Sequence, residues 1–245
     1  MELSVQLYTV RDALVADLDR TIDRIAAMGF TSVEPYNFAA DHDRLAAALR
    51  RNGLAAPSGH APLLSANQED ICAAAQSLGM RTVIDPFVDP ARWASVEDIA
   101  ATAAQLNDAA AVAARYGLQV GYHNHWFEVE TDFEGRTGLE VLADHLDPAV
   151  VLEVDTYWVA VGGQDPAALL GRLGERVRLI HLKDGAIDRD PTSQVAVGAG
   201  LMNIEGVLQA SSAVETVVVE LDDSAGDLFA AIEESRRFLL ARAGA

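Results

Sequence analysis

The chain is short of cysteine and of basic residues. One of its 245 residues is cysteine, so an intrachain disulfide and a cysteine-rich metal site are both excluded. Cys72 lies in a helix-like run, where we expect a small buried hydrophobic residue. Lys and Arg number 18 against 37 Asp and Glu, which gives a formal net charge of −19. Nucleic acids and anionic membranes are bound chiefly through Lys and Arg, so we expect neither as a partner.

Long hydrophobic runs are also lacking. No apolar stretch approaches the roughly 20 residues of a membrane-spanning helix. The N-terminus enters a strand-like segment, residues 2–8, without a basic leader. We therefore expect a soluble, cytoplasmic protein. Lysine is the scarcest charged residue, because Lys183 is the only one and all other basic residues are arginine.

Strand-like and helix-like segments alternate along the whole chain. Predicted strands cover residues 2–7, 31–35, 54–60, 81–85, 118–123, 150–155, 177–182 and 216–221. Predicted helices cover residues 12–28, 41–51, 68–78, 95–116, 137–146, 165–173, 204–211 and 227–242. Glycine followed by a hydrophobic residue marks four helix ends: Gly29-Phe30, Gly53-Leu54, Gly79-Met80 and Gly117-Leu118. Eight βα units predict the α/β class, as one (β/α)8 TIM barrel domain over residues 1–245.

Every predicted strand closes on a polar residue. These residues are Gln6, Glu34, His60, Asp85, His123, Asp155, His181 and Glu220. In a barrel such ends meet at the C-terminal face, so the set predicts a funnel-shaped site. Taken singly, Asp85 or Gln6 is equally well explained as a turn former or helix cap. Alternation places Val83 and Glu153 one layer deeper in the interior and Ile84 against the helices.

The stretch Leu118 to Glu130, LQVGYHNHWFEVE, concentrates histidine and glutamate directly behind a strand. Read with period two, His123 and His125 share one face of that strand, and Tyr122 lies on the other. One of the imidazoles could be a hydrogen-bonded structural histidine. Two on one face, together with the other polar strand ends, favour ligands.

Four of the strand ends form a candidate metal set: His123, Asp155, His181 and Glu220. Two imidazoles and two carboxylates suit Mn, Zn, Co or Fe better than Ca, which prefers oxygen ligands, and Mg is also compatible. The sequence therefore predicts one divalent metal ion.

A family resemblance covers essentially the whole chain. The segments SVQLYTVRD, GFTSVEPYNF, YHNHWFEVE, LEVDTYWV, IHLKDG and VVVELDD resemble the xylose isomerase-like TIM barrel superfamily, in the branch of sugar phosphate isomerases and epimerases with a YHNH motif. The superfamily also holds inosose isomerases and dehydratases and endonuclease IV. The resemblance implies metal ligands at Asp155, His181 and Glu220.

The chain departs from the epimerases of that superfamily at two positions. They carry a glutamate, half of their acid/base pair, where this chain has His123. His125 is the alternative ligand on this strand, and Glu128 could bend back into the site to contact substrate. Trp158 stands where the epimerases tend to place a substrate-binding histidine, and it could form a wall against a sugar face.

The resemblance implies a metal-dependent sugar isomerase or epimerase, acting on a keto-sugar or cyclitol through an enediolate formed by proton abstraction next to a carbonyl. A dehydratase or lyase that uses the same first step, acting on an inosose or eliminating from a keto-glycoside, is the alternative. We expect Glu220 as ligand and base, His125 as the second acid/base, and Lys183 as a donor to a substrate oxygen. Glu34 and His60 are expected to contact substrate hydroxyl groups.

Two further classes remain as weaker alternatives. An endonuclease IV-like repair enzyme disagrees with the net charge and with Asp85 and Trp158, which stand in place of the extra histidines of a trinuclear zinc site. A non-catalytic sugar-binding barrel would have lost a ligand, and none is lost. Gly198 and Gly200 are the nearest candidates for a phosphate site. Barrels of this family often pair, so we also expect a homodimer.

Overall fold

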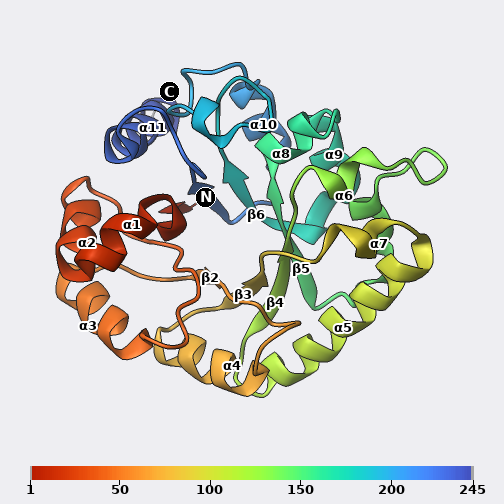
Figure 1. Cartoon of the computed structure of the whole chain (residues 1–245), viewed down its shortest axis with the longest axis horizontal. Helices are drawn as coiled ribbons and strands as arrows, with labels where there is room; N and C mark the ends of the chain where they lie inside the picture. Colours follow the sequence, from red (N-terminus) through yellow and green to blue (C-terminus); the bar gives the residue numbers. More distant parts are fainter. Residues whose placement is uncertain (1, 244–245) are drawn as a thin grey trace.

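A curved parallel sheet occupies the centre of the computed structural model, which describes residues 2–243 (Figure 1). Seven strands follow the order β1-β7-β6-β5-β4-β3-β2, and neighbouring strands are parallel. The strands are β1 (Glu2–Val5), β2 (Ser58–His60), β3 (Thr82–Asp85), β4 (Gln119–His123), β5 (Val150–Asp155), β6 (Val177–Leu182) and β7 (Thr216–Val219). Parallel pairing through helical crossovers is what the alternation in the sequence predicts.

Residues 32–36 lie between β1 and β2 and close the sheet into a barrel. The bridging pairs are Gln6–Glu34, Ser32–Ala55 and Tyr36–His60. The predicted strand over residues 31–35 is therefore the eighth stave, although it makes isolated bridges rather than a continuous ladder. Pro35 has no N–H to donate to a ladder, which accounts for part of this irregularity.

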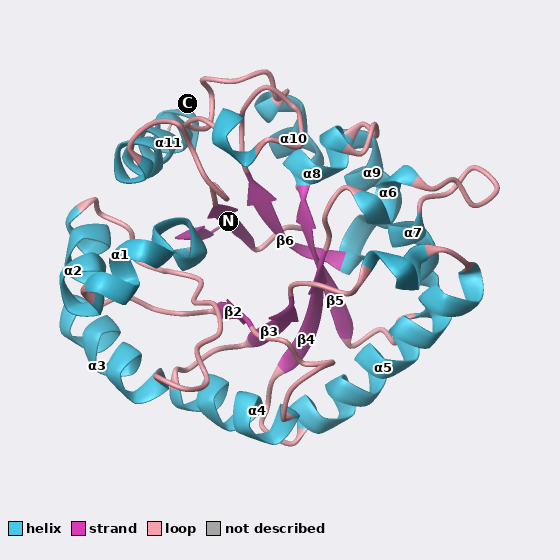
Figure 2. Cartoon of the chain, in the orientation of Figure 1, coloured by secondary structure: helices cyan, strands magenta, loops and turns pink. Residues whose placement is uncertain are grey.

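Helices form a layer outside the strands (Figure 2). They are α1 (Arg11–Ala16), α2 (Leu18–Ala27), α3 (His42–Asn52), α4 (Gln68–Ser77), α5 (Val96–Ala114), α6 (Phe127–Glu130), α7 (Gly138–His145), α8 (Thr156–Val161), α9 (Pro166–Leu173), α10 (Ile204–Ala210) and α11 (Leu228–Ala243). The helix predicted over 12–28 is two helices, because Asp17 is extended and accepts a hydrogen bond from the Arg20 amide at 3.1 Å. The short helices α6 and α8 were not predicted.

The four predicted glycine stops are confirmed, since Gly29, Gly53, Gly79 and Gly117 all have positive φ. At Gly53 the left-handed backbone lets the Leu54 amide donate to the Leu49 carbonyl at 3.0 Å. The residues that follow the four glycines are all buried, so each stop turns the chain back toward the barrel: Phe30, Leu54, Met80 and Leu118.

The interior of the barrel corrects one prediction. Ile84, Val151 and Leu179 form a small cluster of their own, whereas Val83 belongs to the large core between strands and helices. The facing predicted for β3 was therefore wrong, and Asp85 turns away from the interior. Both Val83 and Ile84 are apolar, so alternation could not decide between them.

Three further expectations concern Cys72, membrane-spanning helices and the homodimer. Cys72 is buried and unpaired, as predicted. Within residues 2–243, no helix combines the length and apolar character needed to cross a membrane. The homodimer stays a prediction.

Candidate active site

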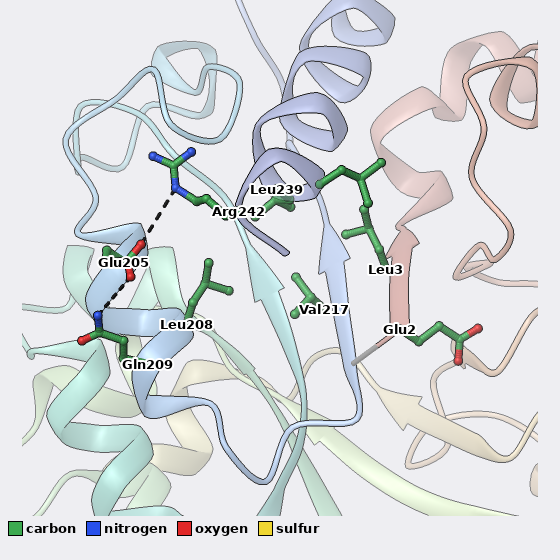
Figure 3. Close-up of a pocket in the computed structure, with 9 residues that line it drawn as sticks. Glu2, Leu3, Glu205, Leu208, Gln209, Val217, Leu239 and Arg242 are labelled. Carbon is green, nitrogen blue, oxygen red and sulfur yellow. Dashed lines mark hydrogen bonds and ion pairs between the residues drawn. The ribbon is translucent and has the colours of Figure 1, made fainter. Parts of the chain in front are cut away.

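A cavity of about 220 Å³ opens at the C-terminal ends of the strands. Its lining residues are Tyr8, Tyr36, Asn37, His60, Pro86, Phe87, His123, His125, Glu220 and Asp222. A larger cavity of about 360 Å³ lies in the outer layer between α10 and α11, against Leu3 of β1 and Val217 of β7 (Figure 3). Its lining is mainly apolar and holds none of the predicted site residues, so we place the chemistry at the smaller cavity.

The four predicted metal ligands lie together at this end of the barrel. One donor atom from each of His123, Asp155, His181 and Glu220 lies within 4.8 Å of all the others. His181 Nδ1 is 2.6 Å from Glu220 Oε2, and His123 Nε2 is 3.8 Å from Asp155 Oδ2. All four side chains are buried. This buried set of two imidazoles and two carboxylates fits a divalent cation.

Lys183 compensates the charge of this group. Its Nζ lies 2.9 Å from Asp155 Oδ2, 2.8 Å from Glu220 Oε2 and 2.6 Å from Asp222 Oδ2. Burial lowers the pKa of Lys183, but the three carboxylates outweigh it and hold the pKa well above its ordinary value. Gln194 fixes Asp222 in turn, since its Nε2 donates to Asp222 Oδ2 at 2.8 Å.

The pKa values of the two predicted carboxylate ligands are shifted in opposite directions. Burial raises the pKa of Asp155, although Lys183 and His181 oppose the shift. Burial also acts to raise the pKa of Glu220, but Lys183 and His181 lower it well below its ordinary value. Glu220 is therefore held ionised, as either a metal ligand or a base requires.

A second buried cluster lies beneath the first and contains Glu34, His60 and Glu153. His60 Nε2 is 2.6 Å from Glu153 Oε2 and 3.3 Å from Glu34 Oε1. Burial lowers the pKa of His60, yet Glu153 and Glu34 raise it to about 9. Burial and Glu34 raise the pKa of Glu153, while His181 and His60 bring it down to about 2.

One residue of this cluster, Glu34, differs from what the sequence indicated. Glu34 does not line the cavity, because its oxygens are engaged by Gln6 Nε2, by the Ser58 hydroxyl and by His181 Nε2 at 2.7 Å. Glu153 lies in the deeper layer, as alternation predicts, but its contacts with the three histidines are not evident from the sequence. One signal in the sequence could have indicated a role for Glu153: it is a lone carboxylate among the small and apolar residues predicted for the interior.

His125 lies at the cavity wall but belongs to neither of the two groups of donor atoms that could hold a metal ion. Its ring stacks on Phe127 with centroids 5.4 Å apart, and it forms a T-shaped pair with Phe87 with centroids 5.6 Å apart. Glu128 is fully buried behind it and accepts from the His125 amide at 2.8 Å and from the Tyr122 hydroxyl at 2.7 Å. Both carboxylate oxygens of Glu128 therefore serve the protein itself.

Trp158 is buried on α8 and does not line the cavity. Its ring packs against Trp126 at 4.9 Å, and Lys183 Nζ lies 5.4 Å from its centroid. The α8 helix directs Trp158 beside Lys183 because Asp155 caps the helix, accepting from the Trp158 amide at 2.9 Å.

Two strand-end or loop candidates have purely local roles. Asp85 accepts hydrogen bonds from the Leu64 and Phe87 amides at 2.9 and 3.1 Å, so it is a loop acceptor outside the site. The amides of Gly198 and Gly200 donate to Asp184 Oδ2 at 2.9 and 3.1 Å. These glycine amides are therefore not available to a phosphate group, which corrects the suggestion made from the sequence.

Most of the chain matches a known protein family. Residues 22–241 match the model of the xylose isomerase-like TIM barrel. The chain belongs to this family. An inosose dehydratase from Lactiplantibacillus plantarum is 38% identical over 80 residues, which are 32% of this chain and 26% of that protein. One from Geobacillus kaustophilus is 35% identical over 80 residues, 32% of this chain and 25% of that protein. The matched segments thus span about a quarter of these relatives.

Solved structures resemble the whole chain at lower identity. A sugar phosphate isomerase/epimerase from Parabacteroides distasonis has a TM-score of 0.82 at 21% identity, covering 98% of this chain and 93% of that one. The probable 3-DHS dehydratase AsbF from Bacillus anthracis has a TM-score of 0.78 at 15% identity, with coverages of 98% and 99%. The IolI protein, whose structure contains a zinc atom, has a TM-score of 0.77 at 15% identity, with coverages of 98% and 97%. These likenesses establish the barrel fold.

Proposed function

We propose that this protein is a divalent-metal-dependent enzyme that removes the proton next to a carbonyl group of a neutral keto-sugar or keto-cyclitol. One observation carries the proposal: four buried donor atoms, on His123, Asp155, His181 and Glu220, converge where two of their residues line an open cavity. A divalent cation held there would polarise the carbonyl and neighbouring hydroxyl oxygens of a substrate.

The residues around this position supply the proton chemistry. Glu220 is ionised and lines the cavity, so it is the proposed base that takes the substrate proton. Lys183 lies behind that carboxylate, outside the cavity lining, and its ammonium keeps Glu220 charged. His125 lies at a separate point of the wall and is the proposed second acid/base. Glu128 and Phe127 orient its backbone and ring.

Loss of water is the proposed outcome. The dehydratase, which is the alternative given from the sequence, is therefore preferred to the isomerase. Glu220 takes the proton beside the carbonyl, and the resulting enediolate expels the hydroxyl group of the next carbon. His125 gives that hydroxyl a proton, so water leaves and an enol remains, which tautomerises to a ketone. The relatives that match by sequence are inosose dehydratases, which supports this outcome.

Isomerisation or epimerisation is the second candidate. It shares the first step but returns the proton to another carbon or face. Glu220 and His125 both line the cavity at different strand ends, and two separated acid/base groups are what such a transfer needs.

The cavity favours a substrate without phosphate. Its described lining includes no lysine or arginine, the side chains that commonly pair with a phosphate group. Arg11 packs over the Tyr8 ring, and its guanidinium donates to the backbone carbonyls of Tyr8 and Asp222. The aromatic rings of Tyr8, Tyr36 and Phe87 in the lining suit the C–H faces of a polyol, and the Asn37 amide suits its hydroxyl groups.

The test is a substrate panel on metal-loaded protein in heavy water. Keto-cyclitols, ketoses and their phosphorylated counterparts are incubated with Mn²⁺-, Co²⁺- or Zn²⁺-loaded enzyme. Deuterium uptake by NMR reports proton abstraction, and mass spectrometry separates loss of one water from isomerisation. We expect turnover of an unphosphorylated keto-cyclitol with loss of water. A preference for phosphorylated sugars would reject the neutral substrate, and no deuterium uptake from any compound would reject the function.

A further inference from the structure

We propose that Glu153 is the positioning carboxylate of the metal centre, fixing the ring orientation and tautomer of both histidine ligands from beneath. The inference rests on the proposed function and adds to it a residue that never touches the substrate. Glu153 lies on β5 two residues before Asp155, on the same face of the strand and one layer deeper in the barrel.

The imidazoles of His123 and His181 each have one nitrogen toward a carboxylate of the outer group, Asp155 or Glu220, and one toward Glu153. His181 directs Nδ1 to Glu220 Oε2 at 2.6 Å, and its Nε2 is 3.1 Å from Glu153 Oε2. His123 directs Nε2 toward Asp155 Oδ2 at 3.8 Å, and its Nδ1 is 3.2 Å from Glu153 Oε2. A neutral imidazole has one lone pair and one N–H, so it binds a metal on one side and donates on the other.

Glu153 is the carboxylate that reaches both histidines. Glu34 shares His181, because its Oε1 lies 2.7 Å from His181 Nε2, but no contact joins it to His123 among the described residues. Glu153 Oε2 also receives His60 Nε2 at 2.6 Å. A single oxygen thus gathers three imidazole nitrogens, while Glu153 Oε1 is buried without a hydrogen-bond partner.

An inner metal site is the competing explanation. His60, His123, Glu153 and His181 also bring ligand atoms within 4.8 Å of one another. Glu153 is fully buried and absent from the cavity lining, whereas Glu220 of the outer group lines the cavity, so only the outer group presents a carboxylate to a substrate. An ion there together with one at the outer site would also require His123 and His181 to lose both ring protons. The donor role of the inner nitrogens avoids both difficulties.

The arrangement leaves one carboxylate oxygen of Glu153 buried without a hydrogen-bond partner. Each unpartnered buried polar atom costs free energy, and native proteins keep few of them. Holding two ligand imidazoles in one orientation accounts for this arrangement, because partners behind a ligating histidine strengthen metal binding.

The experiment compares metal affinity and histidine tautomers in the full chain. Mn²⁺ or Zn²⁺ is titrated calorimetrically into wild type, Glu153→Gln and Glu153→Asp, and ¹⁵N NMR reads the ring nitrogens with and without metal. Glu153→Gln keeps the shape but loses the charge, and Glu153→Asp keeps the charge but shortens its reach. We expect one ion per chain in all three proteins. Affinity should fall about 10- to 100-fold in both variants, with mixed tautomers at His123 and His181.

Controls separate this inference from the function on which it rests. Glu34→Gln should disturb the tautomer of His181 alone, and Glu205→Gln, on the exposed face of α10, should change nothing. Unchanged affinity and tautomers in both Glu153 variants would overturn the inference and leave the function standing. Two ions in wild type, with one lost in Glu153→Gln, would make Glu153 a ligand instead. Failure of wild type to bind metal would remove both proposals.

Discussion

Lys183 Nζ lies 2.8 Å from Oε2 of Glu220, the residue proposed both to bind the cation and to take the substrate proton. The sole lysine of the chain thus stands between carboxylates that carry the chemistry. Its ammonium also approaches Asp155 Oδ2 at 2.9 Å. Lys183 and an incoming metal therefore share the same two carboxylates.

Replacing Lys183 by Met should destabilise the metal-free protein and tighten metal binding. Removing one partner from a buried ionic group leaves uncompensated charge, which costs about 3–5 kcal/mol in free energy of unfolding. Added Mn²⁺ should restore more stability to the variant than to wild type, because the carboxylates then lack their internal cation. Urea unfolding with and without Mn²⁺ measures both effects. A metal-free variant as stable as wild type would show that Lys183 does not balance this group.

Asp155 should be needed for metal but not for the fold. Asp155→Ala removes a ligand oxygen and also the cap of α8, which costs about 1 kcal/mol. Asp155→Asn keeps an acceptor for the Trp158 amide and removes only the charge, so it is the cleaner variant. Both should fold, with metal content by elemental analysis falling far below one ion per chain. Asp190→Asn, at an exposed turn, is the matched control, and stoichiometric metal in Asp155→Asn would refute the ligand set.

The barrel and the convergence of the four candidate ligands were predictable because topology alone fixes them. Parallel strands joined by helices must end at one face, so polar residues at the ends of β4, β5 and β6 and just after β7 had to approach one another. The spacing of His123, Asp155, His181 and Glu220 in the chain carries that information without any knowledge of side-chain packing.

The depth of each side chain along the barrel could not be predicted in the same way. Depth depends on the stagger between neighbouring strands, which the sequence pattern does not specify. Glu34 therefore fell beneath the cavity rather than in its wall, and Trp158 turned into the layer around α8. Which side of β3 faces the barrel interior could not be predicted, because Val83 and Ile84 are equally apolar.

Asp85 should make the stability of the protein fall as pH rises through mildly acidic values. Burial raises the pKa of Asp85 from an ordinary 3.8 to about 6, so between these pH values the folded protein binds more protons than the unfolded chain. Stability attributable to Asp85 is therefore highest below its ordinary pKa and is lost as pH rises toward 6. A shift of this size corresponds to roughly 2 to 3 kcal/mol.

Asp85→Asn isolates this contribution, because the amide stays neutral and can still accept one of the two backbone hydrogen bonds. The free energy of unfolding of the variant minus that of wild type should increase between pH 4 and pH 7 by about 2 kcal/mol or more. Urea denaturation across that range gives the difference directly. A difference independent of pH would mean that Asp85 titrates normally in the folded protein.

His125 should be required for turnover and dispensable for metal binding, whereas His123 should be required for both. His123 contributes a nitrogen to the four-atom donor group, while His125 stands apart at the cavity wall with Nδ1 lacking a hydrogen-bond partner. His125→Gln should therefore bind one ion with near wild-type affinity and lose roughly 10²- to 10⁴-fold in rate, the usual contribution of a general acid or base. His123→Gln should lose the metal. Calorimetric titration and deuterium exchange into substrate, measured on the same preparations, separate binding from proton transfer.

Loss of metal in His125→Gln would mean that His125 is the metal ligand and that His123 is not. An active, fully metallated His125→Gln would remove this residue from the mechanism and leave Glu220 with Lys183 as the acid/base pair.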